Sequence, residues 1–159
     1  MNAPGSTEAP IVLLLSGPNL NLLGEREPQI YGTQTLADHV ATATAACGVA
    51  GLGLEHVQSN HEGVLVDAIH HARNRCAAIV INAAAFTHYA WSLHDALAAF
   101  TGPVVELHLS DPTTREPFRH LSVIEPVADA VVRGLGGDGY RVAIEQVANL
   151  LADGSTLTS

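Results

Sequence analysis

The stretch IVLLLSGPNLNLLGEREPQIYG, residues 11–32, decides the fold class. It begins with five aliphatic residues, the length and composition of a β-strand that is buried on both faces of a parallel sheet. The segment that follows is rich in Gly, Pro and Asn, and it contains Arg26 and Tyr31. Loops that follow buried strands often carry functional residues. We therefore expect a strand at residues 11–15 and a functional loop directly after it.

Four more apolar runs follow, separated by segments with helical periodicity. We expect strands at residues 52–57, 77–81, 104–109 and 130–135, and helices at residues 35–47, 62–75, 89–100 and 140–151. Gly48 is expected to end the first helix, and Pro103 to precede the fourth strand. Because strands alternate with helices and no GxGxxG turn is present, the pattern predicts an α/β fold of the flavodoxin-like type. This is a doubly wound, five-stranded parallel sheet with strand order 2-1-3-4-5.

The chain has 159 residues, enough for one domain with a single core. We expect this domain at residues 10–152, a disordered N-terminal tail at 1–9 and a C-terminal tail at 153–159. The first ten residues show no targeting pattern, and no run of ~18 apolar residues is present, so we expect a cytoplasmic protein that does not cross a membrane. Cys47 and Cys76 stand in apolar contexts and are interpreted as reduced core thiols.

The charge composition excludes several classes of function. The formal net charge is -9, which disfavours a nucleic-acid or anionic-membrane partner. All seven cations are arginines, so a lysine imine and a P-loop phosphate grip are both excluded. Only 14% of the residues are charged, against a usual ~25%, which indicates that self-association covers part of the surface.

Ligands of such sheets bind outside the carboxyl ends of the strands, where the strand order reverses. The loops after the first, third and fourth expected strands are the polar ones. Together they bring these candidate site residues to one edge: Asn19, Arg26, Tyr31, Asn82, His88, Glu106, His108, Ser110, Arg115 and Arg119.

The residue types in these loops suit acid–base chemistry. A phenol such as Tyr31 ionises only near pH ~10, so it needs nearby arginines to act as a base at neutral pH. Glu106 and His108 alternate along one strand and share a face, where the carboxylate can fix the imidazole tautomer and make it a better proton donor. Taken singly, Tyr31 could be a packing residue and His108 a structural one. Together they suit proton abstraction beside a carbonyl and loss of water from an anionic substrate, without a cofactor.

Several longer motifs in the same order resemble one known family, the type II 3-dehydroquinate dehydratases. They are GPNLNLLGEREPQIYG, QSNHEGVLVDAIHHA, INAAAFTH, DAL, PVVELHLS, REPFRH and GLGGDGY, which span residues 11–151 with the segments between them. The resemblance implies dehydration of 3-dehydroquinate to 3-dehydroshikimate by anti elimination, in the shikimate pathway of aromatic amino acid biosynthesis or in quinate catabolism. It also implies trimers grouped into a dodecamer, with Asp95 reaching the site of a neighbouring subunit.

The resemblance further implies a role for each matching residue. Tyr31 would take the C2 proton, and His108 would protonate the departing C1 hydroxyl. Arg26 would lie on a mobile lid over the substrate, with Arg115 assisting, and Asn19 would hold a water against the enolate oxygen. The remaining assignments are Asn82, Leu109 and Ser110 for the substrate carboxylate, His88 and Arg119 for its ring hydroxyls, and Glu106 for orienting the catalytic groups.

The chain departs from the family pattern at a few positions. Ala83, Ala84 and Ala85 follow Asn82, where the family usually has a Pro-Gly-Ala or Ala-Gly-Ala run. The segment 111–113, Asp-Pro-Thr, differs from the usual asparagine and histidine, and Asp111 adds a negative charge beside an anion site. Phe86 stands for a common tyrosine and Leu121 for a histidine.

The sequence disfavours two other kinds of function. The nine histidines include the pairs His70 with His71 and His88 with His94, but they form no HExxH or paired-cysteine pattern, which disfavours a metal site. The alternative to an enzyme is an inactive flavodoxin-like binding or scaffold protein. Such a protein has no reason to keep Arg26, Tyr31 and His108 together, so the enzyme is preferred.

Overall fold

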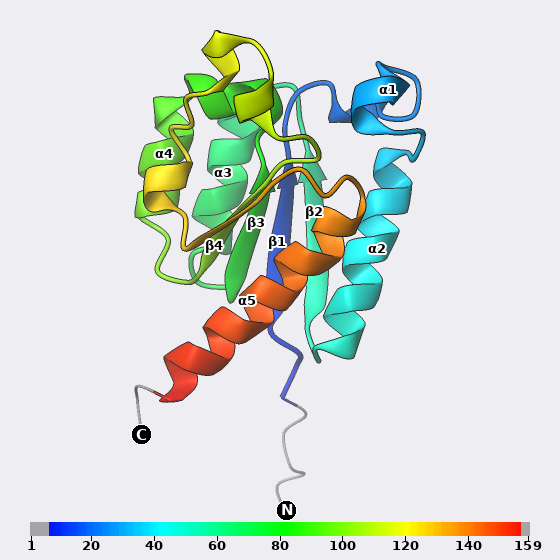
Figure 1. Cartoon of the computed structure of the whole chain (residues 1–159). Coiled ribbons are helices and arrows are strands. Elements are labelled where there is room, and N and C mark those ends of the chain that lie inside the picture. Colours follow the sequence, from blue (N-terminus) through cyan, green and yellow to red (C-terminus); the bar gives the residue numbers. More distant parts are fainter. Residues whose placement is uncertain (1–6, 157–159) are drawn as a thin grey trace, which may run out of the picture.

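A computed structural model describes residues 7–156, with side chains described through residue 154. One five-stranded sheet lies at its centre, and all neighbouring strands are parallel. The order β2-β1-β3-β4-β5 confirms the expected sheet (Figure 1). The strands are β1 (Ile11–Ser16), β2 (Gly53–Gln58), β3 (Ala78–Asn82), β4 (Val104–Leu107) and β5 (Ala130–Val132).

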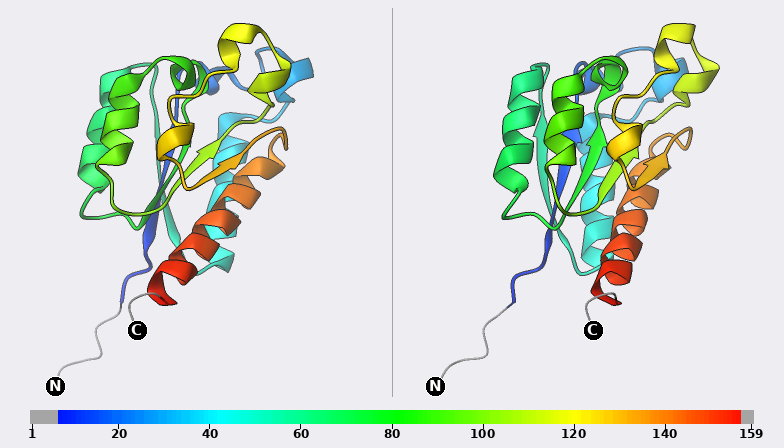
Figure 2. Two further views of the ribbon diagram at one scale, coloured as in Figure 1. Left: turned by 60° about the vertical axis from the view of Figure 1, so that its left-hand side comes forward. Right: turned by 90° about the vertical axis from the view of Figure 1, so that its left-hand side faces the viewer.

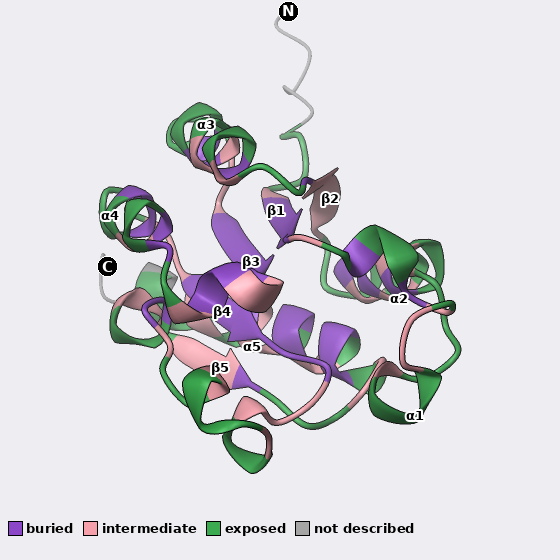
Figure 3. Ribbon diagram, turned by 90° about the horizontal axis from the view of Figure 1, so that it is seen from above, coloured by how far each residue is buried: buried purple, intermediate pink, exposed green. Residues whose placement is uncertain are grey.

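Helices cover both faces of the sheet (Figures 2 and 3). The main ones are α2 (Leu36–Val49), α3 (Glu62–Ala72), α4 (Trp91–Ala98) and α5 (Asp138–Thr156). Successive side chains of a strand point to opposite faces. Leu13 and Leu15 of β1 therefore pack in the core under α3 and α4, whereas Val12 and Leu14 pack in the core under α2 and α5.

The ends of the elements differ from expectation for local reasons. Thr35 is the N-cap of α2 and forms a capping box with Asp38, so the helix begins one residue later. We expected Gly48 to end this helix, but the helix continues to Val49. The chain turns at Gly51 instead, where φ is 73° and the N–H groups of Gly51 and Leu52 bond to the carbonyls of Gly48 and Cys47 in a Schellman motif.

The polar segment after β1 is not one continuous loop. It contains a 3₁₀ turn, η1 (Leu20–Leu22), and the short helix α1 (Pro28–Tyr31). Strands β4 and β5 end at Leu107 and Val132, before the expected residues 109 and 135. Further 3₁₀ turns are η2 (Ala84–His88), η3 (Pro112–Thr114), η4 (Pro117–Arg119) and η5 (Glu125–Val127).

The expected tails are covered only in part. Residues 1–6 of the N-terminal tail and 157–159 of the C-terminal tail lie outside the described residues. Helix α5 runs on to Thr156, so residues 153–156 continue the domain rather than form a tail. Cys47 is buried and Cys76 half-buried, and both are free thiols. Within residues 7–156, no helix combines the length and the apolar character that a bilayer-spanning segment needs.

Candidate active site

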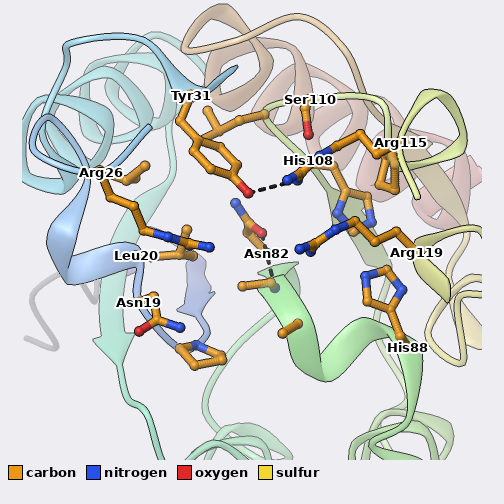
Figure 4. A pocket seen from close by; sticks show the side chains of 16 residues that line it. Asn19, Leu20, Arg26, Tyr31, Asn82, His88, His108, Ser110, Arg115 and Arg119 are labelled. Carbon is orange, nitrogen blue, oxygen red and sulfur yellow. Dashed lines mark hydrogen bonds between the residues drawn. The ribbon is translucent and has the colours of Figure 1, made fainter. Parts of the chain in front are cut away.

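The carboxyl ends of the strands form the floor of a polar pocket. Ser16 of β1 is level with Gln58 of β2 and Asn82 of β3, so the loops that follow these strands leave the sheet at one height. The segments after β1 and β4 rise on opposite sides above this edge (Figure 1). They enclose a cavity of about 110 Å³. Its lining includes ten of the expected site residues: Asn19, Arg26, Tyr31, Asn82, His88, His108, Leu109, Ser110, Arg115 and Arg119 (Figure 4).

Tyr31 stands at the end of α1 between two guanidinium groups. Nη1 of Arg115 donates a hydrogen bond of 2.7 Å to the phenolic oxygen, which Figure 4 shows turned toward that arginine. The Cζ atoms of Arg26 and Arg115 both lie 5.4 Å from the centre of the Tyr31 ring. Charged donors at a phenolic oxygen favour its anionic form, so this arrangement supplies the positive charge that a tyrosine base requires.

Glu106 and His108 form a buried pair at the end of β4. Nε2 of His108 lies 2.7 Å from Oε1 of Glu106, which also accepts a 2.6 Å hydrogen bond from the hydroxyl of Ser122. A carboxylate only accepts, so Nε2 carries a proton and Nδ1 is the ring nitrogen left to meet a ligand. Oε2 of Glu106 is buried without a partner among the described residues. The carboxylate thus fixes the imidazole, as the alternation of these two residues predicted.

Asn82 ends β3 and is held by groups below the pocket. Its Oδ1 accepts a 3.3 Å hydrogen bond from the backbone N–H of Ala84, and its Nδ2 donates to the hydroxyl of Tyr140 over 3.5 Å. Asn19 has φ of 66°, and its N–H donates to Oδ1 of Asn60 over 3.0 Å. The side chains of Asn19 and Asn82 both reach the pocket (Figure 4).

His88 and Arg119 lie together on the far side of the pocket from Asn19 (Figure 4). Nδ1 of His88 donates to the carbonyl of Leu121 over 2.7 Å, which leaves Nε2 for a ligand. Nε of Arg119 bonds to a carboxylate oxygen of Glu116 at 2.7 Å. Both contacts orient the side chains without using the groups that would face a substrate hydroxyl.

Two of the expected residues do not line this cavity. Glu106 does not reach the cavity and instead contacts Nε2 of His108. Asp95 lies on the exposed face of α4 and is not part of the pocket of its own chain. Among the described residues, no group of three or more His, Cys, Asp or Glu side chains is placed to bind a metal ion.

Residues 10–148 match the family model described as "Dehydroquinase class II". The chain belongs to this family. It is 51% identical over 144 residues to "3-dehydroquinate dehydratase 2" of Pseudomonas putida, covering 91% of this chain and 97% of that protein. It is also 51% identical over 147 residues to the "Catabolic 3-dehydroquinase" of Pyricularia oryzae, covering 91% and 94%. The crystal structure of type II dehydroquinase from Propionibacterium acnes superimposes with a TM-score of 0.85 at 39% identity, over 89% of this chain and 97% of that chain.

The structure explains how this chain accommodates its departures from the family pattern. Ala84 takes the place of the usual glycine and has φ of 51°, a left-handed conformation that costs a non-glycine residue about 1–2 kcal/mol. Leu121 replaces a histidine, but its contact with His88 is made by the backbone carbonyl, which any residue provides.

Asp111 is held by hydrogen bonds within its own turn. Its Oδ1 accepts hydrogen bonds from the N–H and the hydroxyl of Thr113, and these bonds lower the pKa of the carboxyl group. Asp111 is not among the residues that line the cavity. The Asp111 carboxylate caps the start of η3.

Two residues that support the site had no assigned role in the sequence. Ser122 bonds to Glu106, and Tyr140 bonds to Asn82. Tyr140 is the last residue of the GLGGDGY motif, so the sequence motif could have pointed to it. Nothing in the sequence distinguishes Ser122 from other loop serines.

Proposed function

We propose that this protein is a 3-dehydroquinate dehydratase that forms 3-dehydroshikimate by anti elimination through an enolate. One observation carries the proposal. The Tyr31 hydroxyl accepts a 2.7 Å hydrogen bond from Arg115 in a small pocket that His108 also lines. Nε2 of His108 is held by the Glu106 carboxylate. The proposed base at the end of α1 and the proposed acid just after β4 thus line one cavity, as an elimination requires.

The first step is removal of the proton at C2. Tyr31 as the phenolate takes this proton, and the C–H electron pair moves into the carbonyl at C3 to give an enolate. The guanidinium groups of Arg26 and Arg115 lie beside the ring, where their positive charge stabilises the phenolate. Asn19 holds a water that donates a hydrogen bond to the enolate oxygen.

The second step is loss of the C1 hydroxyl. The enolate electrons re-form the carbonyl and build the C1–C2 double bond while the C1–O bond breaks. Nδ1 of His108 gives a proton to the leaving oxygen, which departs as water. Glu106 stabilises the protonated imidazole through Nε2. Exchange of protons with water then returns Tyr31 and His108 to their starting states.

Binding groups around the pocket match an anionic, hydroxylated ring. The backbone N–H groups near Leu109 and Ser110, the Ser110 hydroxyl and the Asn82 amide hold the carboxylate. His88 and Arg119 meet the ring hydroxyls through the groups left free by their contacts with Leu121 and Glu116.

The segment 17–32 acts as the lid. Arg26 pairs at 3.3 Å with its neighbour Glu27, and both side chains are 39% exposed, so this surface ion pair opposes movement of the arginine only weakly. Asn19 near the start of the segment has φ of 66° and Gly32 at its end has φ of 80°, which marks the turns that bound it. Closure of such a lid excludes water and strengthens the contacts of the arginines with the phenolate.

The protein assembles as trimers grouped into a dodecamer, with Asp95 reaching the pocket of a neighbouring copy. Trp91 and Asp95 are one helical turn apart on α4 and both exposed, so they share a face. The Trp91 side chain is 58% exposed, a large apolar area for a monomer to leave in water.

The test is direct. Purified protein given 3-dehydroquinate with neither metal nor cofactor should produce a conjugated enone, seen as rising ultraviolet absorbance. Borohydride added with substrate should leave activity intact, because the chain has no lysine to form an imine. Absence of the enone, or loss of activity with a chelator, would contradict the proposal. The reaction is the same in biosynthesis and in quinate breakdown, so this assay addresses the chemistry common to both.

A further inference from the structure

The GLGGDGY motif, residues 134–140, forms the turn from β5 into α5. Its glycines permit a close approach to the start of α2. A Cβ on Gly137 would lie 2.3 Å from Oε1 of Gln34 and 2.9 Å from Cε1 of His39. Gly136 has φ of 57°, which glycine adopts without strain. The motif therefore brings Tyr140 under the floor of the pocket.

The ring of Tyr140 is fixed by stacking on His39. The two ring centres are 4.8 Å apart and the planes differ by 4°. Both residues are 1% exposed. Burial lowers the pKa of His39, so its ring is neutral, and neither of its nitrogens has a hydrogen-bond partner among the described residues. His39 thus acts here as a flat apolar support for Tyr140.

The hydrogen bonds of Asn82 fix which end of its amide faces which way. A backbone N–H can only donate, so the atom that meets the N–H of Ala84 is the amide oxygen. The amide nitrogen then faces the hydroxyl of Tyr140. One N–H of the amide goes to Tyr140, and the second is left for the pocket, which Asn82 lines.

We infer that Tyr140 is a positioning residue: its hydroxyl holds the Asn82 amide so that an N–H, and not the carbonyl oxygen, faces the substrate carboxylate. A flipped amide would turn its carbonyl oxygen toward the substrate carboxylate. Since both groups only accept hydrogen bonds, they would repel each other. Burial raises the pKa of Tyr140 to about 12, so its hydroxyl stays uncharged beneath the anion. The inference rests on the proposed function, in which Asn82 binds the carboxylate.

Replacement of Tyr140 by Phe keeps the stacked ring and removes only the hydroxyl. Because the carboxylate is bound equally before and during the reaction, we expect KM for 3-dehydroquinate to rise about three- to tenfold while kcat stays within about twofold. Tyr89→Phe is the matched control, since Tyr89 is exposed and outside the pocket, and it should leave both constants unchanged. Thermal unfolding of both variants separates loss of stability from loss of orientation.

A double-mutant cycle with Asn82→Ala tests whether Tyr140 acts through Asn82. Asn82→Ala alone should raise KM, and adding Tyr140→Phe should then change KM no further. Equal KM for wild type and Tyr140→Phe would overturn the inference, as would a full extra loss in the Asn82→Ala background. Wild-type protein without dehydratase activity would instead reject the proposed function.

A second variant keeps the inference testable if Tyr140→Phe does not fold. Gly137→Ala retains the Tyr140 hydroxyl, but the added methyl group pushes on the His39 ring on which Tyr140 stacks. We expect a raised KM with kcat retained. An unchanged KM in a folded Gly137→Ala protein would contradict the coupling between this motif and the pocket.

Discussion

Arg115 and Tyr31 are 84 positions apart in the chain, yet Nη1 of Arg115 donates a 2.7 Å hydrogen bond to the Tyr31 phenol. This contact joins the segment after β4 to the segment after β1 across the pocket. It gives the phenol a charged donor in a partly buried place, where such a contact is stronger than in water.

Removal of the charge of Arg115 should slow the reaction. Arg115→Gln keeps a hydrogen-bond donor on a shorter side chain but removes the positive charge beside the phenol. We expect kcat/KM to fall about ten- to hundredfold, that is by roughly 1.4–2.7 kcal/mol. Arg73→Gln, at an exposed position at the end of α3, is the control and should match wild type in the enone assay. Equal rates for both variants would remove Arg115 from the mechanism.

Glu106→Gln tests the buried pair behind the acid. The substitution keeps the shape of the side chain but removes the carboxylate that contacts Nε2 of His108. We expect kcat to fall about ten- to hundredfold with little change in KM, because Glu106 does not line the substrate pocket. Glu125→Gln, which only loosens an exposed 3.6 Å pair with Arg133, should keep full activity. A rise in KM with normal kcat would show that Glu106 acts on binding instead.

Ala84→Gly should stabilise the protein. The left-handed conformation of Ala84, with φ of 51°, costs alanine about 1–2 kcal/mol, whereas glycine adopts it freely but loses more chain entropy on folding. We expect a net gain of up to about 1 kcal/mol in the free energy of unfolding, measured by urea titration at fixed protein concentration. Ala83→Gly, where φ is -75°, should destabilise instead. A loss at position 84 equal to that at position 83 would contradict the strain argument.

Stability should fall as the pH is lowered below neutrality. Burial lowers the pKa of both His39 and His56, so they stay neutral in the folded protein at a pH where the unfolded chain begins to bind protons. The unfolded state therefore gains protons as the pH falls through about 6.5, and the free energy of unfolding decreases from there until the folded-state pKa is reached. Melting temperatures at pH 7.5 and 5.5 measure this. His39→Phe should reduce the difference between them, and an unchanged difference would exclude His39 as a cause.

The assembly prediction is tested by particle mass. Twelve copies of a 16.6 kDa chain give about 200 kDa by light scattering. Asp95→Ala should lower activity if Asp95 completes a neighbouring site, although it does not line the pocket of its own chain. A monomer of full activity would contradict both the assembly and the role of Asp95.

The sheet order and the pocket were predictable from the sequence because both follow from simple periodicity. Buried parallel strands read as short aliphatic runs, and their carboxyl ends must share an edge, so Tyr31, Asn82 and His108 were expected together. The contact of Glu106 with His108 followed from their alternation along one strand. Both features depend on local sequence pattern and on one topological rule of parallel sheets.

The support below the site could not be predicted in the same way. The bonds of Tyr140 to Asn82 and of Ser122 to Glu106 join segments 58 and 16 positions apart, and no local pattern encodes such contacts. The end of α2 was misplaced because Gly48 and Gly51 are both plausible C-terminal glycines, and only the backbone shows that Gly51 adopts the left-handed turn.

The most direct test of the account is the turnover of Tyr31→Phe. This variant keeps the ring between Arg26 and Arg115 and removes only the oxygen that is proposed to take the proton. Enone formation should slow by about 10²–10⁴-fold, while binding of quinate, a substrate analogue without the carbonyl that activates the C2 proton, should stay near that of wild type. A Tyr31→Phe enzyme that dehydrates 3-dehydroquinate at the wild-type rate would show that the base is another group.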